Sequence, residues 1–183
     1  DFRSLASELT VPFIHSPKIS MEIISKHISK NQSDIAVSIN YSGVIPDEVV
    51  NFFPFGILNA HGGDLPKYRG NACQAWAIIN GESRIGLCIH SMIGGELDSG
   101  KIIAREYLKI DINTRIGQVY TWFENRIPEL FLKSVELLSK DLGYFLEEQS
   151  KDPKDALRCY PRMPEDGKID WTKSNIDILR LIN

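Results

Sequence analysis

Apolar residues recur along the chain with two spacings, one typical of buried strands and the other of one-sided helices. Between positions 18 and 30, isoleucines stand at Ile19, Ile23, Ile24 and Ile28, which is the spacing of an amphipathic helix. Residues 11–14 predict a short strand before this helix, and the compact apolar run at residues 34–39 predicts a buried parallel strand after it. The amino-terminal part of the chain thus begins as strand, helix, strand.

The same alternation continues through the next hundred residues. Residues 46–48 predict the start of a helix, with a proline early and acids in the first turn. Residues 56–59, 85–92 and 101–108 predict strands, and residues 72–80 and 114–142 predict helices. Pro128 predicts either a kink in the last of these helices or the start of a second helix. This order predicts an α/β fold with a mostly parallel sheet flanked by helices, whose ligands bind beyond the carboxyl ends of the strands.

The length of 183 residues suits one globular domain. We expect this domain to span residues 1–150, and residues 151–183 to form a connecting tail and the start of a carboxyl-terminal segment. The stretch 149–167 is charged and contains Pro153, Pro161 and Pro164, which predicts an extended connection. Because the chain opens without Met and stops within a helical pattern, we also expect a fragment that could lack the amino-terminal strands of its sheet.

Charge and composition narrow the function classes. The formal net charge is -3, so the chain lacks the basic excess of most nucleic-acid binders. It contains neither the run of about 20 apolar residues that a membrane helix needs nor a signal peptide, so a cytoplasmic protein that does not enter membranes is expected. Cys73, Cys88 and Cys159 show no metal-ligand spacing and are expected to be reduced packing residues.

Two polar residues follow the predicted strand at residues 56–59. Alternation along an extended backbone would turn the side chains of Asn59 and His61 to the same side. Taken alone, the pair is more typical of a turn cap and a surface histidine, so the neighbouring motifs decide its interpretation.

Four blocks in fixed order accompany this pair. They are Leu65-Pro66-Lys67-Tyr68-Arg69-Gly70, then Trp76-Ala77-Ile78-Ile79-Asn80-Gly81-Glu82, then Gly86-Leu87-Cys88-Ile89-His90-Ser91-Met92, and finally Leu97-Asp98-Ser99-Gly100. Together with Asn59-Ala60-His61 they resemble the 10-formyltetrahydrofolate-dependent formyltransferases, a family that acts on methionyl-tRNA, glycinamide ribonucleotide or nucleotide-linked sugars and includes a formyltetrahydrofolate hydrolase. The resemblance covers residues 34–108.

The resemblance implies a Rossmann-like formyltransferase fold, 10-formyltetrahydrofolate as formyl donor, and no metal. By it, Asn59, His61 and Asp98 match the catalytic residues of the family. The folate-binding residues that it implies are Leu65, Pro66 and Arg69 beside the cleft, and Ile93, Gly94, Gly95, Glu96 and Leu97 in a loop. It also suggests a cis peptide at Leu65-Pro66, which the sequence leaves open.

The proposed chemistry needs these three side-chain types. An amine attacks the formyl carbon, an oxyanion forms, and the departing folate nitrogen must receive a proton. Asn59 offers an uncharged N–H donor to the oxyanion. His61 can accept the proton of the amine or stabilise the oxyanion as imidazolium, and Asp98 would hold that ring or order a water molecule. As an alternative, Asp98 is simply a turn residue before Ser99-Gly100.

Several other features favour plain structural interpretations. His90 alternates with Cys88 on a predicted strand without a second ligand pair, so it is expected to be a core histidine. No Gly-x-Gly-x-x-Gly pattern indicates a dinucleotide site. Where the family commonly has a serine two positions after the histidine, this chain has Gly63, and it gains Asp64, which either attracts a cationic acceptor or lies in a solvated turn.

The tail of the chain and its net charge both bear on the identity of the formyl acceptor. Residues 160–171, with Tyr160, Arg162 and Trp171, resemble the connecting segment of tRNA and sugar formyltransferases, which lowers the odds of a glycinamide ribonucleotide enzyme. The acidic balance then favours a nucleotide-linked amino sugar over tRNA. A formyltetrahydrofolate hydrolase and a non-catalytic folate-binding protein stay open, and a homodimer is compatible with the sequence.

Overall fold

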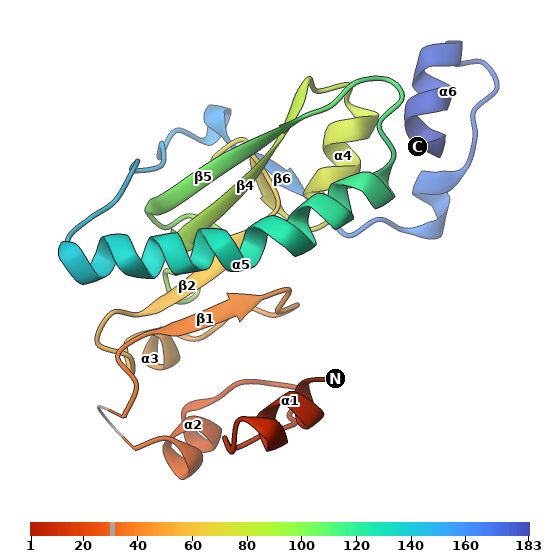
Figure 1. The fold of residues 1–183 in the computed structure, drawn as a ribbon. Helices are drawn as coiled ribbons and strands as arrows, with labels where there is room; N and C mark the ends of the chain where they lie inside the picture. Colours follow the sequence, from red (N-terminus) through yellow and green to blue (C-terminus); the bar gives the residue numbers. More distant parts are fainter. Residues whose placement is uncertain (30–31) are drawn as a thin grey trace.

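The computed structural model describes residues 1–29 and 32–183. Its α-helices are α1 (Phe2–Glu8), α2 (Met21–His27), α3 (Asp47–Val50), α4 (Cys73–Ile79), α5 (Ile116–Lys140) and α6 (Asn175–Ile182). Its strands are β1 (Ala36–Ile39), β2 (Ile57–His61), β3 (Tyr68–Gly70), β4 (Arg84–Ser91), β5 (Ile102–Lys109) and β6 (Leu157–Cys159), and two 3-10 turns, η1 (Pro153–Asp155) and η2 (Pro164–Gly167), lie in the tail. The α/β class is confirmed (Figure 1).

The main sheet has the order β1-β2-β4-β5 and is mixed rather than mostly parallel. β1 and β2 are parallel, whereas β4 runs antiparallel to both β2 and β5. The connection explains the β4–β5 pair: a loop of residues 92–101 joins the two strands directly, and a direct loop without a crossover helix joins antiparallel neighbours. Strand periodicity alone does not contain this information.

The first strand of this sheet is less buried than its sequence suggests. Val37 and Ile39 of β1 are 56% and 51% exposed, although the apolar run predicted a strand buried on both faces. β1 is the edge strand of the sheet within the described residues, and only its other face, with Ser38, is buried.

Two predictions for the amino-terminal part need correction. Residues 11–14 form no strand, and Val11 and Ile14 are exposed, since no strand of the described residues pairs with this segment. The helix predicted for residues 18–30 is shorter. It begins after Ser20, whose hydroxyl accepts the N–H of Ile23, and it ends at His27; Lys30 lies outside the described residues.

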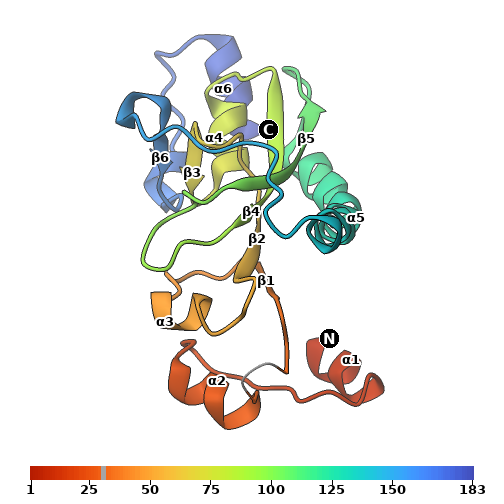
Figure 2. The same ribbon diagram turned by 90° about the vertical axis from the view of Figure 1, so that its left-hand side faces the viewer.

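The long helix α5 packs along β4 and β5 and closes one face of the core (Figures 1 and 2). It is one continuous helix with Pro128 inside it, rather than two helices. Its inward side chains Val119, Phe123, Leu130 and Phe131 join the main apolar cluster with Leu87 and Ile89 of β4. Although α5 has 25 residues, neither it nor another described helix combines the length and apolarity needed to cross a membrane.

The tail, residues 151–183, packs against the preceding part of the chain. Its strand β6 pairs in parallel with β3, and the Trp76 indole donates a hydrogen bond of 2.8 Å to the Tyr160 carbonyl. Farther on, α6 lies beside α4 (Figure 1). The expected extended connection therefore contains a short strand and two 3-10 turns, because β3 offers an edge with which residues 157–159 can pair. The domain boundary near residue 150 stays a prediction.

Candidate active site

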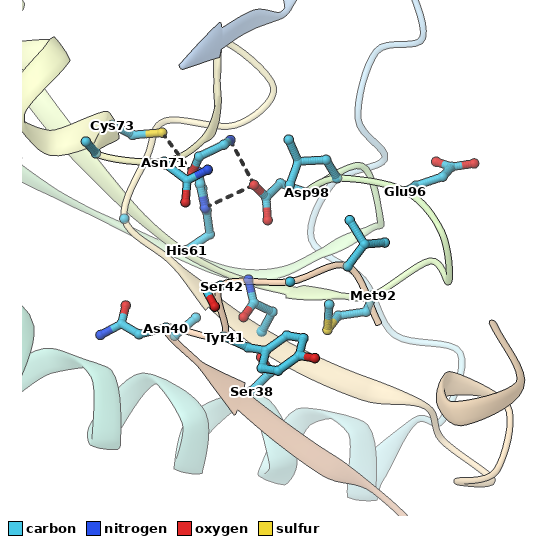
Figure 3. A pocket seen from close by; sticks show the side chains of 18 of the residues that line it. Ser38, Asn40, Tyr41, Ser42, His61, Asn71, Cys73, Met92, Glu96 and Asp98 are labelled. Atoms are coloured by element: carbon cyan, nitrogen blue, oxygen red, sulfur yellow. Dashed lines mark hydrogen bonds and ion pairs between the residues drawn. The ribbon is translucent and has the colours of Figure 1, made fainter. Parts of the chain in front are cut away.

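Asn59 and His61 lie at the carboxyl end of β2, between β1 and β4. Both line a cavity of about 390 Å³, a volume in the range of small-molecule sites. Figure 3 shows His61 at this cavity, with Asp98 beside it. The alternation of the strand turns the two side chains to the same side, as the sequence predicted. The structure thus brings the carboxamide and the imidazole to one cavity.

The His61 ring is held in one orientation by the backbone. Its Nε2 lies 2.6 Å from the Tyr68 carbonyl oxygen, and because that oxygen only accepts, Nε2 is the protonated donor. Nδ1 then has the lone pair of the neutral ring and lies 3.5 Å from Oδ2 of Asp98. Burial lowers the pKa of His61, and the Asp98 carboxylate only partly offsets this effect. The neutral ring, a proton acceptor at Nδ1, is therefore favoured at neutral pH.

Asp98 lies in the loop before β5 with a backbone φ of +48°, in the left-handed region that Asp tolerates better than most residues. The backbone N–H of Gly70 donates a hydrogen bond of 2.9 Å to its Oδ2. Burial opposes ionisation of the carboxyl, but contacts with His90 and His61 and the Gly70 N–H outweigh burial and lower the pKa of Asp98 to about 2. The carboxylate is therefore charged beside His61.

His90 of β4 is buried, as expected of a core histidine, but its ring contacts two candidate catalytic residues. In the β2–β4 register it lies opposite Asn59, whose Nδ2 is 3.1 Å from its Nε2. Its Nδ1 donates a hydrogen bond of 2.9 Å to the Ser91 carbonyl, and its Nε2 accepts the N–H of the Asn59 amide. Nε2 also lies 3.5 Å from Oδ1 of Asp98. Sequence reasoning missed this role, because only the pairing of β2 with β4 shows it.

The buried side chain of Gln149 forms hydrogen bonds with the loop that contains Asp98. The Gln149 amide donates hydrogen bonds of 2.8 Å to the Asp98 carbonyl and 2.7 Å to the Gly100 carbonyl. Its oxygen accepts from Nε and Nη2 of Arg69, at 3.2 and 2.8 Å. Every polar atom of this side chain thus has a partner, and the amide links the loop to β3.

Only some of the eight folate-binding residues expected from the resemblance line the cavity in the structure. Glu96 and Leu97 line the cavity beside Asp98, whereas the remaining six expected residues, Leu65, Pro66, Arg69, Ile93, Gly94 and Gly95, do not. Leu65 is buried, in a small cluster with Cys88 and Ile102, and the Leu65-Pro66 peptide is cis, as the resemblance suggested.

Three of the other expected residues, Arg69, Ile93 and Gly94, lie outside the main cavity. Arg69 lines a second cavity, which it shares with Leu97. A Cβ on Gly94 would lie 2.1 Å from Cα of Asp47, so this glycine allows the loop to approach α3 closely. Ile93 is 44% exposed.

One wall of the cavity was not predicted. Residues following β1, among them Asn40, Tyr41 and Ser42, line it opposite Asp98 (Figure 3). A usable signal existed, since these residues follow a strand predicted to be parallel to β2, and ligands bind beyond the carboxyl ends of such strands.

Asp64 does not face the cavity. Its carboxylate accepts from the Arg84 guanidinium at 3.2 Å and from the Tyr107 hydroxyl at 3.0 Å. An attraction for a cationic acceptor is therefore not supported, because the carboxylate is engaged elsewhere. Within residues 1–29 and 32–183, no three His, Cys, Asp or Glu side chains gather as a metal-binding group.

The chain is similar to known proteins in sequence and in fold. A family model described as "Formyl transferase" matches residues 14–135. The methionyl-tRNA formyltransferase of Fusobacterium nucleatum is 32% identical over 157 residues, which cover 86% of this chain and 49% of that protein. The chain spans about half the length of the curated methionyl-tRNA formyltransferases that it matches first.

Solved structures show the same fold. WlaRD, a sugar 3N-formyl transferase solved with dTDP and 5-N-formyl-THF, superposes with a TM-score of 0.75 at 21% identity, over 98% of this chain and 61% of that one. The N-formyltransferase of Helicobacter canadensis, solved with folinic acid and dTDP-3-aminofucose, also gives a TM-score of 0.75 at 21% identity, with the same two coverages. These similarities confirm the predicted formyltransferase fold.

Proposed function

Because this chain belongs to the formyl transferase family, we propose that it transfers a formyl group from 10-formyltetrahydrofolate to a substrate amine. The proposal rests above all on one observation: His61 Nδ1 lies 3.5 Å from a carboxylate oxygen of Asp98, at a cavity that Asn59 also lines. A proton acceptor, a charged partner for it and a neutral hydrogen-bond donor are the groups that formyl transfer to an amine requires.

We assign the formyl donor to the cavity of about 390 Å³, where the 93–97 loop faces the segment after β1. The wall offers polar groups at Asn40, Ser42 and Glu96 and apolar surface at Leu97 and Met92, the mixture expected for a folate ring system. Two similar structures contain folate compounds, which supports this assignment. The other folate-binding residues expected from the sequence would contact the donor only indirectly, or farther along its length.

In the proposed reaction, His61 acts first as a base. Nε2 is occupied by the Tyr68 carbonyl, so the incoming proton of the amine would be accepted at Nδ1. The imidazolium formed in this way is stabilised by the Asp98 carboxylate, which is already charged because its pKa is about 2. The same proton can then pass to the departing folate nitrogen. General acid–base catalysis of this kind contributes about 100- to 10,000-fold in rate.

Asn59 would stabilise the oxyanion of the tetrahedral intermediate. One N–H of its amide donates to the lone pair of His90 Nε2, which determines which end of the amide is the donor. The second N–H stays available for the oxyanion, with no charge to neutralise and little reorganisation. His90 therefore acts through Asn59, as a positioning residue.

For the acceptor, we propose the amine of a nucleotide-linked amino sugar. The acidic chain, with a net charge of -3, suits tRNA poorly, and similar structures include sugar N-formyltransferases. Methionyl-tRNA is the second candidate, favoured by the sequence relatives. The two candidates differ in the acceptor alone, since both use the same donor and the same three residues.

The test is a turnover assay of the full chain with 10-formyltetrahydrofolate and a panel of acceptors. Formation of tetrahydrofolate that depends on an amino-sugar nucleotide, together with the formylated sugar, is the expected result. Dependence on methionyl-tRNA would select the second candidate. Formate release without an acceptor would indicate a hydrolase, and folate binding without turnover would indicate a binding protein. The cytoplasm is the proposed compartment, because Cys73, Cys88 and Cys159 are free thiols, which suits a reducing environment.

A further inference from the structure

A second cavity, of about 350 Å³, lies next to the candidate active site. Arg69 of β3, Lys151 and Arg158 of β6 line it, together with one acid, Asp152, and the apolar side chains of Leu97, Pro153 and Ala156. Two of these residues, Leu97 and Arg158, also line the first cavity. The two cavities therefore share a wall, and one extended ligand could occupy both.

The charge of this cavity is opposite to that of the chain. Three cations and one carboxylate surround it, in a protein of formal net charge -3. None of the three cations forms an ion pair within 4.0 Å with an acid of residues 1–29 or 32–183. Within the described residues, no direct ion pair with a carboxylate therefore neutralises their charges.

Two of the cations are held next to each other by the backbone. In the parallel β3–β6 pair, Arg69 and Arg158 are direct partners, so their side chains leave the same face of the ribbon. Like charges in such positions destabilise strand pairing. The Arg69 guanidinium is also held by Gln149 and cannot move away without losing two hydrogen bonds. A bound anion would remove the repulsion that this arrangement creates.

We propose that this second cavity binds the anionic group of a substrate whose reacting atoms lie near His61. The inference rests on the proposed function for the identity of the reacting group, but the anion site itself follows from the charges and the register. Two chemical sources fit: the phosphates of a nucleotide-linked acceptor and the glutamate carboxylates of the folate donor. Both place more than one negative charge away from the group that takes part in formyl transfer: the phosphates lie between the sugar and the nucleoside, and the carboxylates lie at the end of the folate.

The test uses direct binding, so that it does not depend on turnover. Calorimetry on the full chain measures the Kd of thymidine diphosphate, of 5-formyltetrahydrofolate and of inorganic pyrophosphate, for the wild type and for Lys151→Gln, Arg158→Gln and the double variant. Lys133→Gln is the matched control. It removes the same charge from an exposed position of α5, on the other side of the β4–β5 pair (Figure 2).

We expect the Kd of at least one of the three ligands to rise about 3- to 10-fold in each single variant and further in the double variant, with no change in the control. Added salt should weaken binding less in the double variant, because fewer charges remain to be screened. A rise for thymidine diphosphate assigns the acceptor phosphates, and a rise for 5-formyltetrahydrofolate assigns the donor carboxylates.

Equal Kd values in wild type, single and double variants for all three ligands would overturn the proposal, as would the absence of binding to the wild type. A different result would contradict the proposed function, namely the absence of turnover by the wild type. If the wild type shows no turnover but binds pyrophosphate in a charge-dependent way, the anion site is supported and only the proposed function is contradicted.

Discussion

His61 Nδ1 and Asp98 Oδ2 are 3.5 Å apart, although one residue ends β2 and the other lies in the loop before β5. The distance permits an ion pair as soon as Nδ1 gains a proton, while in the neutral state the lone pair faces a carboxylate. The pair is thus better matched to the protonated ring than to the resting one. This asymmetry favours proton transfer to His61 during the reaction.

Asp98→Asn should reduce turnover by about 100-fold or more, because the imidazolium would lose its charged partner. It should also move the acidic limb of the pH profile. Wild-type activity should fall as pH decreases through the pKa of His61, which burial has lowered from 6.5. The Asp98 charge raises that pKa, so its removal lowers the pKa further and shifts the limb to lower pH. Steady-state rates across the acidic range measure both effects.

The control for this variant is Glu124→Gln, which removes one negative charge from an exposed position of α5. Its rate and pH profile should equal those of the wild type. An acidic limb that stays in place in Asp98→Asn would contradict the pairing of Asp98 with His61.

Asn59→Ala should reduce kcat by about 100- to 1000-fold with little change in KM for the folate donor, because the lost hydrogen bond forms with the oxyanion rather than with the ground state. Asn59→Asp should be at least as impaired, since a carboxylate would repel the oxyanion. Separate kcat and KM values for the two variants give the answer. A change confined to KM would instead place Asn59 in substrate binding.

Gln149→Leu should lower both turnover and stability, since two loop carbonyls and Arg69 would lose their partner in a buried place, at about 1–3 kcal/mol for each unsatisfied group. Gln149→Glu separates the two halves of the contact. It can still accept from Arg69 but cannot donate to the carbonyls of Asp98 and Gly100.

If the amide positions Asp98, the glutamate variant should lose turnover about as strongly as the leucine variant, and its acidic limb should shift in the same direction as that of Asp98→Asn. Wild-type turnover in Gln149→Glu would instead indicate that only the Arg69 contact matters. Urea unfolding with the rate assays distinguishes a displaced loop from an unfolded chain.

Gly70→Ala should lower the free energy of unfolding by more than the roughly 1–3 kcal/mol of a strained backbone. Gly70 has φ of +100°, and a Cβ there would lie 2.2 Å from the Cys159 carbonyl oxygen, so β6 would have to leave β3. Gly95→Ala is the matched control, because Gly95 also has a positive φ but no atom within 4 Å of an added Cβ. Similar losses in both variants would show that backbone strain alone, without the β3–β6 contact, accounts for the effect.

Much of the fold was accessible from local patterns. The apolar runs predicted β2, β4 and β5 within one or two residues, and the spacing of Asn59 and His61 predicted two side chains on one side of a strand. These features depend on residues close together in the chain, where side-chain alternation and helix periodicity act directly. The recognised motifs then connected Asp98 to the same site.

The direction of β4, the exposure of β1 and the partners of His90 and Gln149 were decided only in three dimensions. Each depends on which strand or loop packs against which, and many different packings are compatible with the same run of apolar residues. The pairing of Arg69 with Arg158 shows this most clearly. Two arginines distant in the sequence become neighbours because a tail strand finds the free edge of β3, and no periodicity within either segment reports that contact.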